Sequence, residues 1–362
     1  MKKTLQIIAP LLIACLGLVG WWLWRHYIPQ TRQTLASPIP FTQQLSALDS
    51  KGFSQLEEIA RFTTPTTSGP VVAVALPAGK DELLAAYSGD HYVRRWNLAN
   101  GSLAAELKLD WISAKGTKFS ADGARLAAGR TVWNAITGEC LTIPCEEIYW
   151  IENGEELIYP KGSWLVGYNQ GSHHLGINCI NSFCNETKSY SLGDFEDPMG
   201  LLTISKVALD ATGGFAAVAF EQGTIRIYRF TGNANLDIIH RVELGERWGI
   251  APTRTLIFDE TRSWLASVRV DELTVWDLRL GRNQRHFSAQ VPTVNVLAFD
   301  HSGKFLLVGT ESALQVWDVT SKRLLKEYAT DSVSALIVSP DGRLVIWGDD
   351  RGVVHLWGSA AP

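Results

Sequence analysis

The chain has 362 residues, of which 46% are hydrophobic and 19% are charged, and this composition excludes a disordered protein. Its formal net charge is −4 and no basic stripe stands out, so nucleic acid is not an expected partner. Fourteen tryptophans beside only two methionines favour β structure with aromatic packing over a helical bundle.

The first element is a strongly apolar run at residues 5–24. Twenty residues form a helix of about 30 Å, enough to cross the hydrocarbon core of a bilayer. Lys2 and Lys3 precede the run, and tryptophans cluster at its carboxyl end, as in an interfacial aromatic belt. Residues 1–28 are therefore predicted to be an uncleaved signal anchor with one transmembrane helix.

Two other interpretations of this run stay open. The residues before Cys15 resemble a lipobox, which makes Cys15 a candidate lipidation site, and a cleaved signal peptide is the third reading. Basic residues are nearly balanced across the helix, but a short basic tail before a large domain favours export of that domain. We expect an inner-membrane protein with its main domain on the periplasmic side, joined to the anchor by a Pro-punctuated linker at 29–52.

The rest of the chain repeats one pattern of an apolar strand, a turn with Asp and Gly, a small-residue strand, a second turn and a strand that ends in an aromatic residue. The aromatic markers are Trp96, Trp133, Tyr228, Trp276, Trp317 and Trp357. The last three lie 41 and 40 residues apart, which is the spacing of four-stranded propeller blades. A degenerate blade is expected between Trp133 and Tyr228, with its first two strands near 148–150 and 157–159 and its third near 175–181. Seven blades are predicted.

The markers also carry a family resemblance. Trp276-Asp277 and Trp317-Asp318 resemble the dipeptide that names the WD-repeat family, and the turns at 299–303 and 338–342 resemble its first-hairpin turn. The resemblance covers about residues 53–362 and implies an all-β, seven-bladed β-propeller that acts through binding. The family's Gly-His pair is absent before the first strands, so its Asp-His-Ser-Trp hydrogen-bond network is expected to be incomplete.

The ends of the repeat region predict how the ring closes. The last repeat ends at 353–357 without an outer strand, while residues 54–63 form an orphan strand near the start. In propellers of this family an amino-terminal strand commonly completes the last blade, which removes free sheet edges. We therefore expect residues 54–63 to pair with residues 353–357.

Four cysteines lie in the most irregular part of the repeat region. They form two C-x4-C pairs, Cys140 with Cys145 and Cys179 with Cys184. An even count in an exported domain favours disulfides, and all three connectivities stay open. Free buried thiols and a zinc site near His173 and His174 are the alternatives.

One rim of the expected propeller is a candidate surface for other proteins. The turns before the third strands carry acidic residues whose fields would add and favour a basic partner, and two tryptophans lie just before first strands on the same rim. The candidate rim residues are Asp90, Trp111, Glu221, Trp248, Asp271, Glu272, Glu311, Asp349 and Asp350. The alternative is architectural, because the family uses an Asp at this turn to tie each blade together and tryptophans often pack between blades.

No catalytic or cofactor-binding motif stands out, and the first strands at 71–76, 294–299 and 333–338 are apolar. The expected function is therefore a non-catalytic, membrane-anchored scaffold of a cell-envelope complex that binds proteins without a cofactor. An envelope-assembly factor similar to quinoprotein-like propeller lipoproteins and a propeller hydrolase or lactonase are the alternatives.

Overall fold

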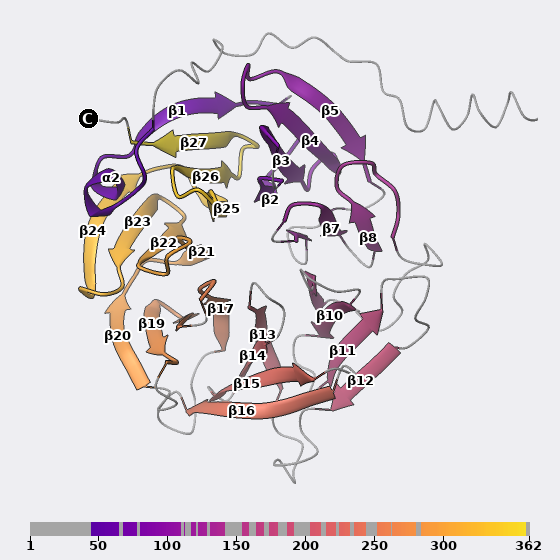
Figure 1. The fold of residues 1–362 in the computed structure, drawn as a ribbon, viewed down its shortest axis with the longest axis vertical. Coiled ribbons are helices and arrows are strands. Elements are labelled where there is room, and N and C mark those ends of the chain that lie inside the picture. The colour runs from indigo at the N-terminus through magenta and orange to yellow at the C-terminus, as the bar shows by residue number, and fades with distance from the viewer. Residues whose placement is uncertain are drawn as a thin grey trace, which may run out of the picture.

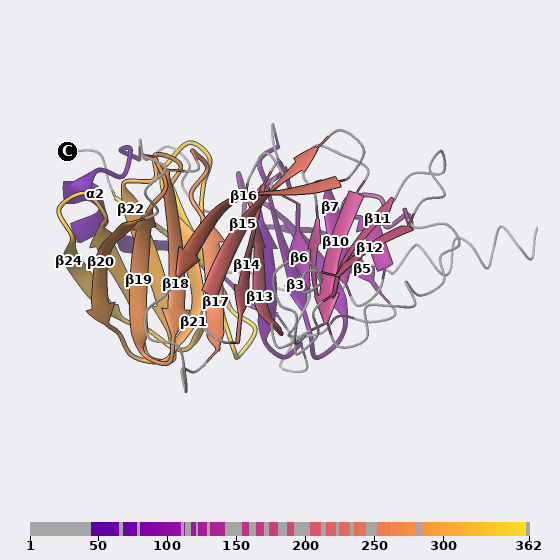
Figure 2. The ribbon, with the colours of Figure 1, turned by 90° about the horizontal axis from the view of Figure 1, so that it is seen from below.

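Short antiparallel strands form sheets that follow one another around a central axis in the computed structural model of this protein (Figure 1). In the side view the strands run through the thickness of the ring (Figure 2). The structure describes residues 45–64, 68–77, 80–109, 112, 117–120, 122–128, 131–141, 154–158, 164–169, 174–179, 187–191, 203–210, 215–221, 224–231, 235–243, 252–261, 263–279 and 284–359.

Six sheets have four strands each. In each sheet the strand that comes first in chain order lies nearest the axis, except in the closing sheet, where the early strand β1 (Glu57–Phe62) is outermost. One sheet contains β2 (Val71–Ala75), β3 (Glu82–Tyr87), β4 (Tyr92–Asn97) and β5 (Leu103–Lys108). Another contains β9 (Gly154–Ile158), β10 (Trp164–Asn169), β11 (His174–Cys179) and β12 (Thr187–Ser191). The next contains β13 (Ile204–Leu209), β14 (Phe215–Phe220), β15 (Thr224–Thr231) and β16 (Asn235–Glu243).

The carboxyl-terminal half of the ring is built in the same way. One sheet contains β17 (Thr253–Phe258), β18 (Trp264–Arg269), β19 (Glu272–Asp277) and β20 (Gln284–Gln290). Another contains β21 (Val294–Phe299), β22 (Phe305–Thr310), β23 (Ala313–Asp318) and β24 (Arg323–Ala329). The closing sheet contains β25 (Val333–Val338), β26 (Leu344–Asp349), β27 (Val354–Gly358) and β1 (Glu57–Phe62).

The blade count differs from the prediction, because the described residues form six complete blades and not seven. The remaining sheet has three strands, β6 (Lys118–Phe119), β7 (Arg125–Ala128) and β8 (Thr131–Asn134). In the described residues an isolated bridge between Trp133 and Cys140 stands where a fourth strand was expected. An aromatic marker therefore identifies a third strand without guaranteeing a fourth.

The sheet between Trp133 and Tyr228 also differs in its strands. Residues 157–158 end its first strand, β9, whereas the sequence assigned 157–159 to the second strand. The second strand is β10, and residues 148–150 lie outside the described residues. The expected third strand at 175–181 overlaps β11.

The blades share bulges at regular positions. In five blades the inner strand is bulged at its second residue, and in four the pairing between third and outer strands shifts just before the marker. A bulge increases local twist and redirects side chains. Trp96, Tyr228, Trp276 and Trp317 are all buried.

The predicted ring closure is confirmed. Strand β1 pairs antiparallel with β27, and the pairs run from Glu57 opposite Gly358 to Phe62 opposite Val354. A short helix, α2 (Ser50–Ser54), precedes β1 and is capped by the carboxylate of Asp49. The last part of the expected linker, from residue 45 onward, therefore packs on the propeller.

Gly348 in β26 lies where the closing sheet meets the first. A Cβ atom at Gly348 would lie 2.4 Å from Cβ of Val71, so Gly348→Ala is expected to lower the free energy of unfolding by about 1–3 kcal/mol through overpacking. Urea denaturation measures the change. Gly342→Ala is the comparison, because Gly342 has open space and only its positive φ opposes a side chain. Equal stability of Gly348→Ala and wild type would contradict the prediction.

Among the described residues, no helix is long and apolar enough to cross a membrane. The predicted anchor at 5–24, its Cys15, and most of the linker lie outside the described residues. The membrane anchor therefore stays a prediction.

Candidate functional site

The acidic residues of the predicted rim lie at turns between second and third strands. The turns are β3–β4 with Asp90, β14–β15 with Glu221, β18–β19 with Asp271 and Glu272, β22–β23 with Glu311, and β26–β27 with Asp349 and Asp350. Since every blade has the same strand order, these turns lie on one face of the ring, called the rim face below. Trp111 and Trp248 lie outside the described residues.

Three of these carboxylates are engaged within their own blades. Asp90 forms an ion pair with the buried guanidinium of Arg94, with Oδ2 at 2.5 Å from Nη2. Glu221 accepts a 2.7 Å hydrogen bond from the hydroxyl of Thr203. Asp349 is 1% exposed and accepts hydrogen bonds from the backbone N–H groups of Arg351 and Val353. These three contacts hold a turn to its own blade, as expected if these acidic residues have an architectural role.

Three other carboxylates are exposed on consecutive blades. The side-chain carboxylates of Asp271, Glu311 and Asp350 make no hydrogen bond or ion pair with the described part of the chain. Glu272 is different, since it lies 4.0 Å from Arg269 and 3.9 Å from Arg285.

An apolar side chain lies next to the first of these carboxylates. Val270 is 48% exposed, and its φ of 49° is unusual for a β-branched residue. The neighbouring bases do not cancel the rim charge, because Arg269 faces Glu272 and Arg351 pairs with Asp331. This part of the rim face combines negative charge with an exposed apolar contact.

A second arrangement recurs two residues before the aromatic markers. In four blades a polar side chain of the third strand bonds to a polar side chain of the outer strand. The pairs are Arg94 with Glu106, Thr274 with Ser288, Gln315 with Glu327, and His355 with Glu58. Side-chain pairs across neighbouring strands stabilise a sheet, so this position ties each outer strand to its blade.

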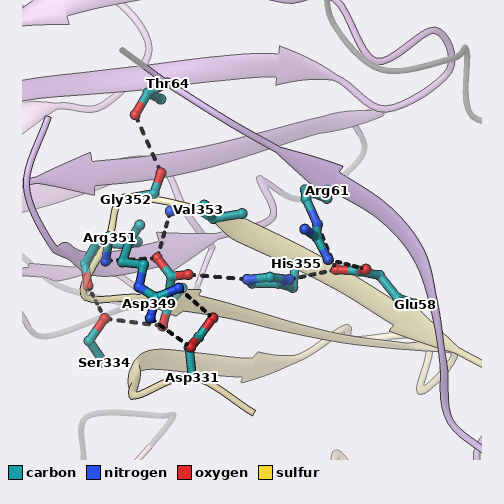
Figure 3. A network of polar contacts seen from close by, with 12 residues as sticks. Glu58, Arg61, Thr64, Asp331, Ser334, Asp349, Arg351, Gly352, Val353 and His355 are labelled. Carbon is teal, nitrogen blue, oxygen red and sulfur yellow. Dashed lines mark hydrogen bonds and ion pairs between the residues drawn. The ribbon is translucent and has the colours of Figure 1, made fainter. Parts of the chain in front are cut away.

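In the closing blade this pair spans the junction between the two ends of the chain (Figure 3). The Nδ1 atom of His355 lies 2.6 Å from Oε1 of Glu58, and Nε2 lies 3.4 Å from Oδ2 of Asp349. Arg61 holds the other side of Glu58 at 2.7 Å. The imidazole stacks on Trp347 with ring centroids 3.8 Å apart. We call Glu58, His355 and Asp349 the seam triad.

Both carboxylates of the seam triad are held in their ionised forms. Burial favours the neutral form of Glu58, but hydrogen bonds from Arg61 and His355 outweigh it and lower the pKa of Glu58. Burial likewise opposes ionisation of Asp349, yet hydrogen bonds from His355 and the Val353 N–H lower its pKa below the ordinary value. The triad is thus a charged clamp between β1, β26 and β27.

Two hollows accompany these groups. A pocket of about 390 Å³ lies beside the seam triad, and a central cavity of about 680 Å³ lies between the inner strands. Lys118, Lys206 and Arg254 line the central cavity from β6, β13 and β17, whereas the inner strands that the sequence named as apolar are those at 71–76, 294–299 and 333–338. Nothing in the described residues groups three or more His, Cys, Asp or Glu side chains around a metal position.

The cysteine predictions are only partly within the described residues. Cys140 is disulfide-bonded. Cys179 ends β11, whose side chains are not described, and Cys145 and Cys184 lie outside the described residues. The pairing of the four cysteines therefore stays a prediction.

The sequence interpretation found Asp349 but missed the rest of the seam triad. A usable signal was present, because Arg94, Thr274, Gln315 and His355 all precede an aromatic marker by two residues. Glu58 has no such signal, since it lies about 300 residues from its partner and becomes a neighbour only when the ring closes.

Comparisons with known proteins place these features in context. No family model matches the chain. The chain is 26% identical over 98 residues to the target of rapamycin complex subunit wat1 of Schizosaccharomyces pombe, a match that covers 26% of this chain and 31% of that protein. The crystal structure of the β-propeller domain of Cps50 (Swd1) from Myceliophteria thermophila covers 84% of this chain and 100% of that domain, with a TM-score of 0.66 and 15% identity. This last similarity shows the fold alone.

Proposed function

We propose that this chain, which is a β-propeller of the WD-repeat type, is a non-catalytic scaffold whose rim face binds a basic segment of another protein. The observation that carries the proposal is the set of three exposed, unpaired carboxylates on consecutive blades, Asp271, Glu311 and Asp350. Their fields add along one edge of the ring and attract a cationic partner. Val270 offers an apolar contact beside them.

The name of one similar protein supports a role in a complex. The relative from Schizosaccharomyces pombe is by name a subunit of the target of rapamycin complex. The apolar run at 5–24 supports the further proposal that the scaffold is anchored in a cell-envelope membrane with its propeller on the periplasmic side. A reporter fused after Pro362 tests that side, since a periplasmic enzyme reporter is active only if the propeller is exported.

Neutralising the rim carboxylates tests the proposed surface. The variant Asp271→Asn, Glu311→Gln, Asp350→Asn is expected to keep the stability of the wild type and to slow association with a basic partner by about tenfold at low salt. The matched control neutralises three exposed carboxylates on the opposite face by Glu57→Gln, Asp81→Asn and Glu139→Gln.

Site-specific photocrosslinking in intact cells provides the measurement. A photoreactive residue at position 311 is expected to give discrete protein adducts that decrease in the Asp271→Asn, Asp350→Asn background, whereas the same residue at position 139 gives none. Binding of a decalysine peptide to the purified chain measures the charge effect directly. Equal adducts at 311 and 139, or equal peptide binding by the rim and control variants, would refute the rim proposal.

A further inference from the structure

The pocket beside the seam triad is formed by two blades. Strands β1, β26 and β27 provide one wall through Glu58, Arg61, Trp347 and Trp357, and the loop after β24 provides the other through Thr330 and Asp331. It is separate from the exposed carboxylates Asp271, Glu311 and Asp350.

Three polar groups of this pocket are buried without a hydrogen-bond partner in the described structure. They are the indole Nε1 of Trp347, the indole Nε1 of Trp357 and the hydroxyl of Thr330. Trp347 is only 2% exposed. A buried donor without an acceptor is unfavourable for folding, so three in one pocket call for an explanation.

The neighbouring blades show how such an indole is normally paired. The N–H of Trp276 donates to the hydroxyl of Ser267 at 3.1 Å, and the N–H of Trp317 donates to Oε1 of Gln315 at 3.0 Å. Leu265 pairs with Trp276 in one blade and Val345 with Trp357 in the closing blade, so Trp347 occupies the position of Ser267. Because tryptophan stands here in place of serine, the indole N–H of Trp357 has no hydroxyl to accept its hydrogen bond. The indole N–H of Trp347 is a second donor without a partner.

The charges around these groups limit what can bind. Glu58 and Asp331 line the pocket and Asp349 lies behind His355, which disfavours a carboxylate. Arg61 and the two indole N–H groups disfavour a cation. A neutral group with both an acceptor and donors fits this mixture.

We propose that the pocket binds the side-chain carboxamide of a glutamine or asparagine on a partner protein. Its carbonyl oxygen accepts from the indole N–H groups of Trp347 and Trp357, and its amino group donates to the hydroxyl of Thr330 or to Asp331. This site is a second contact beyond the rim carboxylates, and it depends on neutral hydrogen bonding where the rim depends on charge.

Entry of the carboxamide requires a small movement of the pocket wall. The three unpaired atoms are covered in the free protein, so the ligand reaches them when a mobile side chain moves aside. The side chain of Arg61 is 55% exposed, and Trp357 is half-buried. Rotation of either side chain leaves the backbone pairing of β1 with β27 intact.

Indole signals of the full-length chain provide the test. The chain is labelled with ¹⁵N-tryptophan, purified in mild detergent and titrated with N-acetyl-glutamine methylamide. The Nε1–H signals of Trp347 and Trp357 are expected to shift saturably with a Kd on the order of 1 mM. The signals of Trp276 and Trp317, which are already paired, are expected to stay in place. The glutamate and norleucine analogues are expected to cause no shift.

Two variants that keep side-chain shape complete the test. Trp357→Phe removes one donor and Thr330→Val removes the hydroxyl, and each is expected to weaken binding of the glutamine probe about five- to tenfold. The matched control Trp317→Phe removes an indole that already has a partner, and it is expected to leave probe binding unchanged. Unmoved Trp347 and Trp357 signals, an equal response to the glutamate analogue, or unchanged binding in both pocket variants would overturn the proposal. Rim variants are expected to bind the probe normally, so failure of either proposal is recognised separately.

Discussion

Deletion of residues 1–63 is expected to abolish cooperative folding of the propeller, whereas deletion of residues 1–44 leaves it folded. The first deletion removes β1 and so leaves β27 as an open edge in the closing blade. It also removes α2 and the apolar residues around it. The deletion breaks the pairing that joins the two ends of the chain, and it exposes the largely buried strand β27 at the edge of its sheet.

The size of the effect follows from what these residues bury. Phe53 is completely buried and contacts the ring of Phe305, with centroids 4.6 Å apart. Phe62 is 2% exposed and packs against Trp96 in the first blade. Truncation of one buried phenylalanine to alanine costs about 3–5 kcal/mol, and the whole stability of a domain is about 5–15 kcal/mol. Loss of both phenylalanine rings together with β1 is therefore expected to cost more free energy than the total stability of the fold.

Urea unfolding followed by tryptophan fluorescence and near-ultraviolet circular dichroism measures the effect. The 1–44 deletion is expected to give a sigmoidal transition, and the 1–63 deletion is expected to give none. The single change Phe53→Ala should fall between them, with a loss of about 3–5 kcal/mol. A cooperative transition in the 1–63 deletion with the midpoint of the 1–44 deletion would show that β1 is not needed to close the ring.

The closing strand was predictable because a missing strand and an orphan strand complement each other. The last repeat lacks an outer strand, residues 54–63 lack a blade, and sheet edges must be paired or protected. The aromatic markers were predictable for a similar reason, since one bulky residue must fill the space between neighbouring blades at each repeat. Local sequence patterns were therefore enough to predict the propeller fold and the strand pairing that closes its ring.

The complete-blade count and the candidate sites were less accessible from sequence. A marker such as Trp133 shows that a third strand exists, but a fourth depends on the short segment that follows. The distinction between Asp349 and Asp350 depends on burial, which places one carboxylate inside the blade and the other in solvent. The pocket depends on Trp347 standing where another blade has Ser267, a comparison that requires the strand register.

Replacement of His355 by leucine is expected to lower the free energy of unfolding at pH 7 by about 3 kcal/mol. The change removes the hydrogen-bonding group between Glu58 and Asp349 and leaves Asp349, which is 1% exposed, with only backbone donors. A buried charge that loses its partner lowers the stability of the folded state, because no other group replaces the hydration that the charge lost on burial. The stacking partner Trp347 retains an apolar neighbour, so packing is largely kept.

The loss is expected to depend on pH in a defined direction. Both carboxylates have lowered pKa values in the folded protein, so the folded state binds fewer protons than the unfolded state in the acidic range. Their contribution to stability is present above the unfolded pKa values of about 3.9 and 4.3, and it is lost as the pH falls through the lower folded values. The stability difference between wild type and His355→Leu should therefore shrink as the pH falls below about 4.

The chain itself supplies the control, since Gln315 occupies the position of His355 in the preceding blade and bonds to Glu327. His355→Gln keeps a hydrogen-bonding side chain toward Glu58 and is expected to recover at least half of the stability lost in His355→Leu. Urea denaturation of the three proteins between pH 7 and pH 3.5 measures both effects. A stability difference between wild type and His355→Leu that stays constant over this range would mean that packing, and not the charged seam triad, accounts for the loss. A loss of stability in His355→Gln as large as in His355→Leu would show that the imidazole ring and its stacking on Trp347 are required.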